Sequence, residues 1–171
     1  ATFAGIRDAL FGHCVILLRG QSLSEEDQVG FASRLGELGR VLHAHKGASK
    51  HHPGVMFISN IRENGELIGA LPDGEMHFHS DQCYMERPTA VSMLYAMEIP
   101  SRGGNTLFAN MYAAYDALPE DLKRRLEGRR ALNVYDYDNS PTLRAAVRED
   151  APRFVHPVVR THPFTGRKAL Y

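Results

Sequence analysis

Short apolar runs bounded by turn-forming residues limit the folds open to this chain more than any other feature of its sequence. Four of these runs are HCVILLRG (13–20), GVMFISNI (54–61), TAVSMLYAMEI (89–99) and NTLFAN (105–110). Two more, FVHPVVRTHP (154–163) and RKALY (167–171), flank a turn predicted at Thr165-Gly166. Short runs rich in β-branched and aromatic residues are typical of strands. We therefore expect strands to predominate in the middle of the chain, with a hairpin turn at Asn64-Gly65.

Helices are predicted near the start of the chain and again between residues 111 and 127. Residues 3–11 carry an apolar stripe at helical spacing. Ser24 precedes EEDQ, which is the pattern of an N-cap followed by acidic residues in the first helical turn. Within 111–127, Pro119 is expected to begin a second helix and Gly128 to end it.

The composition favours one soluble, enzyme-like domain spanning residues 1–171. Of the 171 residues, 43% are hydrophobic and 23% charged, and 20 basic side chains balance 20 acidic ones. A balanced charge argues against nucleic-acid and membrane partners, and the longest apolar runs are too short to cross a bilayer. Only two cysteines are present, Cys14 and Cys83, so no disulfide framework is available. We expect a cytoplasmic location.

Three potential metal ligands alternate in the stretch MHFHSDQCY: His77, His79 and Asp81. Residues 75–84 are predicted to form a strand, on which all three side chains would share one face. Neighbours two residues apart can converge on one ion, whereas His77 and Asp81 are too far apart to do so easily. Two pairs therefore remain open. His77 with His79 would suit a cupin-type site, and His79 with Asp81 would supply part of the 2-His-1-carboxylate triad of non-haem Fe(II) oxygenases.

Longer motifs extend this pattern. FHSDQCY is followed by SMLYAMEIPSRGGNTLFANMYAAYDAL and later by HPVVRTHPFTGRKALY, while ILLRGQSLSEEDQVGFASRLGELG lies near the start. Together they resemble the taurine dioxygenase / 2,4-dichlorophenoxyacetate dioxygenase family of Fe(II)- and 2-oxoglutarate-dependent enzymes. The resemblance implies a mainly β fold with flanking helices, a double-stranded β-helix (jelly roll). Both ends of this fold are expected to be incomplete.

The resemblance also implies a set of site residues. His79 and Asp81 are the expected Fe(II) ligands, with His77 as a neighbour. Thr106, in the family's Gly-Gly-x-Thr motif, is expected to contact 2-oxoglutarate. The distal His ligand and the Arg that binds 2-oxoglutarate are expected in a C-terminal segment beyond Tyr171. His156 and His162 belong to a different motif of the family, so we do not assign them as substitutes.

On the substrate side, the resemblance points to Glu75 and His45, with His43 as a further possibility. An ionised Glu75 beside the pocket would repel a sulfonate, so we expect a substrate that is neutral or cationic at that end rather than taurine.

The implied reaction is hydroxylation of a small organic substrate by O2, with release of succinate and CO2. The presence of Asp81 favours hydroxylation over halogenation, because the related halogenases lack the carboxylate ligand. Two alternatives are a catalytically silent jelly-roll binding domain and a cupin-like metalloenzyme that uses His77 and His79. The expected partner is a small-molecule substrate, with no nucleic acid and no membrane, and we expect the chain to form a homo-oligomer.

Overall fold

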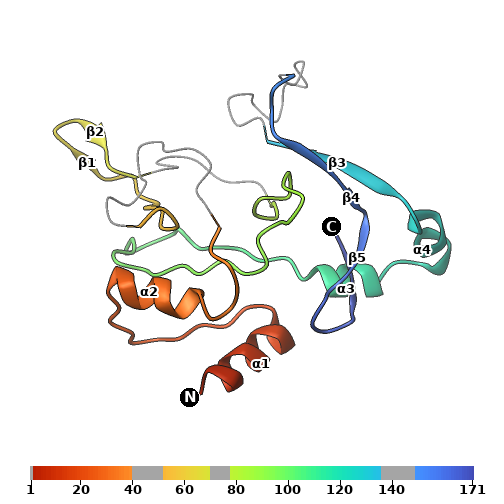
Figure 1. Cartoon of the computed structure of the whole chain (residues 1–171), viewed down its shortest axis with the longest axis horizontal. Coiled ribbons are helices and arrows are strands. Elements are labelled where there is room, and N and C mark those ends of the chain that lie inside the picture. Colours follow the sequence, from red (N-terminus) through yellow and green to blue (C-terminus); the bar gives the residue numbers. More distant parts are fainter. Residues whose placement is uncertain (1, 40–51, 70–77, 136–148) are drawn as a thin grey trace. The chain divides into compact units, whose positions relative to one another are not determined.

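The computed structural model describes residues 2–39, 52–69, 78–135 and 149–171 (Figure 1). Its helices are α1 (Phe3–His13), α2 (Glu25–Ala32), α3 (Met111–Asp116) and α4 (Glu120–Leu126). The strands are β1 (Arg62–Glu63), β2 (Glu66–Leu67), β3 (Arg130–Val134), β4 (Arg153–Pro157), β5 (Val159–Thr161) and β6 (Lys168–Leu170). They form three two-stranded antiparallel sheets, β1 with β2, β3 with β4 and β5 with β6.

The predicted helices are confirmed, and their ends have local causes. Ser24 accepts a hydrogen bond from the Asp27 backbone N–H, while the Asp27 carboxylate accepts from the Ser24 backbone N–H. This capping box satisfies two N–H groups at the start of α2 that have no partner within the helix. α3 begins after Asn110, whose side-chain oxygen accepts from the N–H groups of Tyr112 and Ala113. The predicted break at Pro119 separates α3 from α4.

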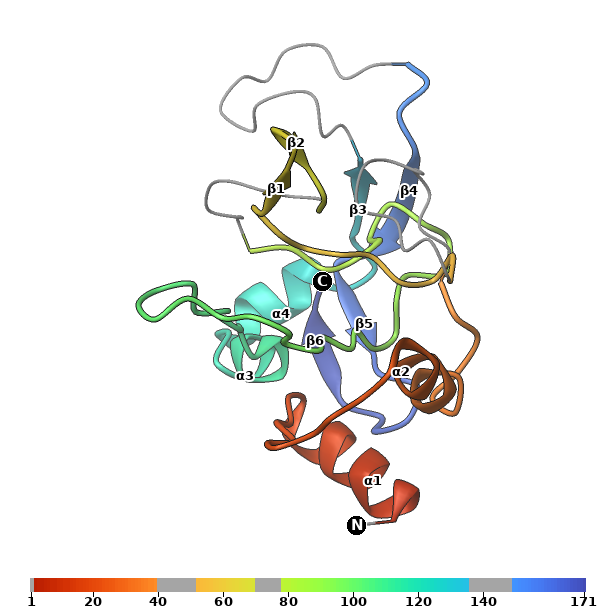
Figure 2. The same ribbon diagram turned by 90° about the vertical axis from the view of Figure 1, so that its left-hand side faces the viewer.

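Both predicted hairpin turns are also confirmed. Asn64 and Gly65 have positive φ angles of 52° and 83° between β1 and β2, as an Asn-Gly turn requires. Gly166 has a φ of 69° in the turn between β5 and β6. Figure 2 shows the two strands of each C-terminal pair lying side by side, β3 beside β4 and β5 beside β6.

Several predicted strands are wrong. Residue 13 still belongs to α1, and residues 14–20, 89–99 and 105–110 are extended, bent or turned without a strand assignment. Residues 54–61 carry only isolated bridges at Met56 and Ile58. An apolar, β-branched run becomes a strand only when a neighbouring chain segment completes its hydrogen-bond ladder. Within the described residues, no strand ladder is assigned to any of these runs, and the run 54–61 has only its isolated bridges and a hydrogen bond from the Ile68 N–H to the Ile61 carbonyl. A closed jelly-roll barrel is likewise not seen among the described residues.

The chain divides into two compact units, each described here by itself. Unit 1 comprises Ala1–Ile16, Phe78–Ser92 and Gly103–Tyr171, and unit 2 comprises Leu17–His77 and Met93–Arg102. Because each unit joins segments that are distant in sequence, the division does not follow chain order. The prediction of a single domain over residues 1–171 stays a prediction. No helix in the described part of the chain is long and apolar enough to cross a membrane.

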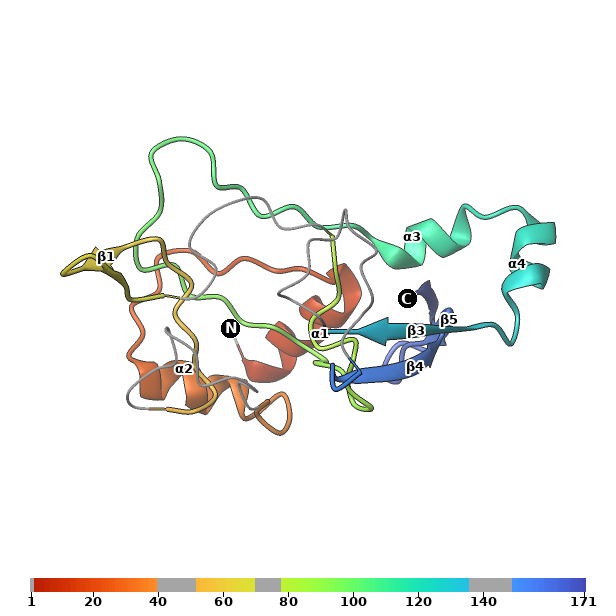
Figure 3. The same cartoon turned by 90° about the horizontal axis from the view of Figure 1, so that it is seen from above.

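Unit 1 contains the candidate site and the best-packed residues. α3 packs against β6, and the chain runs from α3 through α4 into β3 (Figure 3). Tyr112 of α3, Ala151 and His156 of β4 are at most 7% exposed, which makes them the most buried described side chains. In unit 2, the N–H of Leu23 donates to the Tyr95 hydroxyl, which ties the segment before α2 to residues 93–102.

Candidate metal centre

The imidazole of His79 and the carboxylate of Asp81 come together at the start of a tight turn. His79 Nε2 lies 3.2 Å from Asp81 Oδ1, and both side chains are about half exposed. We call residues 79–85 the ligand turn. It is closed by backbone hydrogen bonds from Cys83 to Ser80 and from Met85 to Gln82. Gln82 has a left-handed φ of 53°.

The prediction that this stretch forms a strand is therefore wrong for its described part. Residues 78–80 lack a strand assignment and residues 81–84 are a turn. The two side chains converge because the backbone reverses direction, and not because they alternate along a pleated strand. The His-x-Asp spacing can bring the two side chains together on a strand or on a turn. The predicted proximity of His79 and Asp81 therefore holds, but its cause is the turn.

The separation of the two donor atoms fits a shared metal ion. Imidazole nitrogen and carboxylate oxygen bind first-row metals at roughly 2.0–2.2 Å. Two such ligands at adjacent corners of an octahedron are then roughly 3 Å apart, close to the 3.2 Å seen here. One nitrogen and one oxygen donor also match the preference of non-haem Fe(II) for imidazole and carboxylate. The residues present thus fit the ion that the resemblance implies.

The second carboxylate oxygen of Asp81 is already engaged. Ser92 Oγ donates a hydrogen bond to Asp81 Oδ2, the oxygen that does not face His79. Three residues earlier, Thr89 Oγ1 donates to Gln82 Oε1 over 2.9 Å. Residues 89–92 therefore hold the ligand turn through two side-chain hydrogen bonds from adjacent turn residues.

The far end of the ligand turn rests on the β3–β4 pair. His156 of β4 is 4% exposed, and its Nε2 donates to the Met85 carbonyl oxygen over 2.8 Å. The rings of Tyr84 and Tyr135 lie 4.6 Å apart, centroid to centroid. Burial raises the pKa of the Tyr84 hydroxyl and of the Cys83 thiol above their ordinary values, so both groups are neutral near pH 7.

Neither histidine of the later HPVVRTHP motif joins His79 and Asp81 as a third potential metal ligand. His156 uses Nε2 for the Met85 carbonyl, as above. His162 Nδ1 accepts from the backbone N–H groups of Phe164 and Thr165, each over 3.3 Å. Burial lowers the pKa of His162 below its ordinary value of 6.5, which favours the neutral ring that this acceptor role requires.

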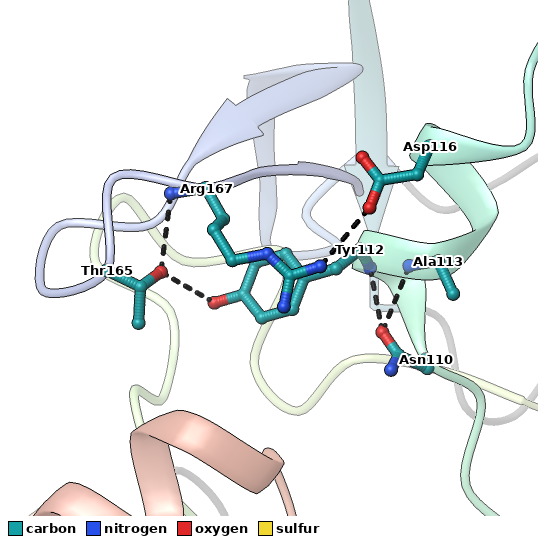
Figure 4. Close-up of polar contacts among 6 residues, drawn as sticks. All are labelled: Asn110, Tyr112, Ala113, Asp116, Thr165 and Arg167. Carbon is teal, nitrogen blue, oxygen red and sulfur yellow. Dashed lines mark hydrogen bonds and ion pairs between the residues drawn. The ribbon is translucent and has the colours of Figure 1, made fainter.

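The turn after His162 is anchored on α3 (Figure 4). The Tyr112 hydroxyl and Thr165 Oγ1 are 3.2 Å apart, and the Arg167 guanidinium lies 4.3 Å from the centroid of the Tyr112 ring. Arg167 also bonds Asp116 over 3.2 Å. These contacts fix the β5–β6 hairpin on the helix through Thr165 and Arg167.

The other predicted site residues stand as follows. Thr106 is exposed and follows Gly103 and Gly104, whose φ angles of 75° and 70° form the predicted two-glycine turn. Its contact with 2-oxoglutarate stays a prediction. The remaining predicted residues, His43, His45, Glu75 and His77, lie outside the described residues. Within the described part of the chain, no group of three His, Cys, Asp or Glu side chains converges on one point.

Sequence reasoning did not find Ser92 or His156 as parts of this site. Ser92 lies in a run interpreted as a strand, where a single serine carries no recognisable signal. The sequence does not assign His156 as a ligand, and nothing in HPVVRTHP indicates that its Nε2 bonds the Met85 carbonyl of the ligand turn.

Comparisons with known proteins identify the family of this chain. Residues 1–171 match the family described as "Taurine catabolism dioxygenase TauD, TfdA family". The chain therefore belongs to the TauD/TfdA family of dioxygenases. It is 36% identical to pentalenolactone F synthase of Streptomyces avermitilis over 97% of its own length and 60% of that protein. It is 35% identical to the alpha-ketoglutarate-dependent 2,4-dichlorophenoxyacetate dioxygenase of Cupriavidus pinatubonensis, over 92% of this chain and 59% of that protein.

Solved structures give the same assignment. A putative alpha-ketoglutarate-dependent taurine dioxygenase from Burkholderia xenovorans superimposes with a TM-score of 0.70 and 29% identity. The match covers 99% of this chain and 53% of that one. The chain thus spans between half and two thirds of the length of the relatives that it matches.

Proposed function

We propose that this chain is part of an Fe(II)- and 2-oxoglutarate-dependent dioxygenase that hydroxylates a small organic substrate and releases succinate and CO2. The observation that carries the proposal is the 3.2 Å approach of His79 Nε2 to Asp81 Oδ1 in a chain of the TauD/TfdA family. We propose that the complete protein adopts the double-stranded β-helix fold. Its proposed location is the cytoplasm. The distal His ligand, the Arg for 2-oxoglutarate and the homo-oligomer stay predictions.

The residues of this chain would act in three ways. His79 and Asp81 would hold Fe(II). Together with 2-oxoglutarate, the bound ion would activate O2 so that one oxygen atom can be inserted into a C–H bond of the substrate. The carboxylate would offset part of the metal's charge, and two protein ligands from one turn keep neighbouring positions free for other ligands. Thr106 would donate its hydroxyl hydrogen to a 2-oxoglutarate carboxylate, as a hydroxyl at the end of a two-glycine turn is placed to do.

The substrate class is supported only by the relatives. One is named for 2,4-dichlorophenoxyacetate, one for phenoxypropionate and one for sulfate esters. We propose a small organic substrate for this protein too. The relatives' named substrates are anions, whereas Glu75 predicts a neutral or cationic group at its end of the pocket.

The proposal is tested by metal titration of the full-length protein. Asp81→Ala should remove most binding of Fe(II), or of Co(II) as an air-stable probe, together with 2-oxoglutarate turnover, because it deletes the only oxygen donor of the pair. His77→Ala is the matched control and should leave metal affinity largely intact. If the His77 variant loses the metal and the Asp81 variant keeps it, the site is cupin-like. Tight metal binding without 2-oxoglutarate turnover would favour the silent binding domain.

A further inference from the structure

Asp81 has two carboxylate oxygens, and the structure distinguishes them. Oδ1 faces His79 Nε2, and Oδ2 accepts the hydrogen bond from Ser92 Oγ. The carboxylate is half exposed, so neither close packing nor burial holds its rotation about the Cβ–Cγ bond. The Ser92 hydroxyl bonds Oδ2 while His79 faces Oδ1, so the two oxygens are not equivalent.

The choice of oxygen has a consequence for coordination. A carboxylate can bind a metal through one oxygen or through both. A 2-His-1-carboxylate site with one carboxylate oxygen leaves three of six positions open, enough for a bidentate co-substrate and O2. If both carboxylate oxygens bound, only two positions would remain. An enzyme of this class therefore needs a means of withholding the second oxygen.

We infer that Ser92 is a positioning residue for the metal centre, which holds Asp81 Oδ2 so that only Oδ1 is presented beside His79 Nε2. This inference rests on the proposed function, since it assumes that His79 and Asp81 bind the metal. Hydrogen-bond partners of metal ligands orient the ligand and commonly change metal affinity by about 10- to 100-fold when they are removed. The serine reaches Asp81 from eleven residues further along the chain, in residues 89–92.

The neighbouring Thr89 provides a control within the same segment. Its hydrogen bond goes to the Gln82 side chain, which is beside the ligand in sequence but does not belong to the donor pair. Removing the Thr89 hydroxyl therefore loosens the attachment of the ligand turn to residues 89–92 and leaves the Asp81 carboxylate engaged. Ser92 is exposed, so a methyl group added there as Ser92→Thr meets solvent and keeps the donor.

The experiment titrates the full-length, metal-free protein with Co(II) and records its visible absorption, whose intensity and position report the number and type of ligands. Ser92→Ala should weaken Co(II) binding by about 10- to 100-fold and change the absorption bands. Ser92→Thr should restore both, and Thr89→Val should keep the wild-type bands.

The possible outcomes separate this inference from the proposed function. Wild-type affinity and bands in Ser92→Ala, with binding lost in Asp81→Ala, would overturn the role of Ser92 and leave the metal site standing. Equal changes in Ser92→Ala and Thr89→Val without rescue by Ser92→Thr would show that Ser92 only braces the turn, which also overturns it. Binding retained in Asp81→Ala would remove the metal site, and the inference with it.

Discussion

At the scale of single residues, the candidate centre depends on side chains whose neighbours restrict how they can be used. His79 and Asp81 are half exposed, yet each presents one defined atom to the other. His156 is nearly fully buried, but its Nε2 is committed to the Met85 carbonyl. Chemical type alone would make all three equal candidates for metal binding. In this structure His79 and Asp81 lie together, whereas the Nε2 of His156 is engaged by the Met85 carbonyl.

Thr106 provides a prediction at this scale. In the full-length enzyme, Thr106→Ala would remove one hydrogen bond to a charged carboxylate, typically worth about 1.5–3 kcal/mol. The apparent affinity for 2-oxoglutarate should then fall by roughly 10- to 100-fold, with metal affinity little changed. Thr106→Ser keeps the hydroxyl and is the matched control. Steady-state kinetics at varied 2-oxoglutarate concentrations measure the effect. If the rate depends on 2-oxoglutarate concentration as in the wild type, Thr106 does not contact 2-oxoglutarate.

At the scale of elements, the β5–β6 hairpin is organised around one histidine. The His162 backbone N–H donates to the Arg167 carbonyl and its carbonyl accepts from Gly166, while Nδ1 accepts from Phe164 and Thr165. The rings of Phe11, Tyr112 and Phe164 lie within 6.0 Å of the imidazole, centroid to centroid. These neighbours are uncharged, so the lowered pKa of His162 has burial as its cause.

This arrangement predicts a loss of stability on acidification. With its pKa lowered in the folded state, His162 binds a proton more readily when the chain is unfolded, so the free energy of unfolding rises with pH. Its contribution should be complete above the ordinary value of 6.5 and should be lost as the pH falls below it towards the folded pKa. Protonation would also remove the acceptor for two backbone N–H groups.

His162→Asn is the informative variant, because its side-chain oxygen can accept the same N–H groups without titrating. Urea unfolding of the wild type and the variant, each with a chelator present to exclude metal effects, should give a stability difference that shifts in favour of the variant between pH 7.5 and pH 5. A difference that stays constant across this range would contradict the role assigned to His162.

At the scale of the whole molecule, the predicted substrate residues precede the ligand turn in the sequence. The ligand turn belongs to unit 1, whereas the predicted substrate residues His45 and Glu75 belong to the stretch of unit 2 between Leu17 and His77. The predicted charge preference is best tested on the full-length protein.

Glu75→Gln tests the predicted charge preference. A partly desolvated carboxylate in contact with a substrate charge has an interaction energy of about 4 kcal/mol at an intermediate dielectric constant. That energy is equivalent to roughly a thousandfold difference in binding affinity. The variant should thus turn over carboxylate and sulfonate substrates better than the wild type, relative to neutral ones. A substrate screen of the full-length enzyme measures this. If a small sulfonate is the best substrate of the wild type, the charge argument is wrong.

Much of the local structure could be predicted from the sequence alone. The cap at Ser24, the break at Pro119 and the turns at Asn64-Gly65 and Thr165-Gly166 all follow from hydrogen bonds and φ angles within a few residues. The proximity of His79 and Asp81 follows from a short, contiguous motif, their role as metal ligands stays a prediction, and the family assignment confirms the wider resemblance.

Only the tertiary structure decided which apolar runs become strands and what surrounds the ligand pair. A run such as 89–99 has strand-like side chains, but a strand also needs a partner at hydrogen-bonding distance, and local sequence does not encode that partner. Ser92 reaches Asp81 across eleven residues and His156 reaches Met85 across 71. Contacts of this range depend on how the chain folds back on itself, and no local pattern of residue types specifies them.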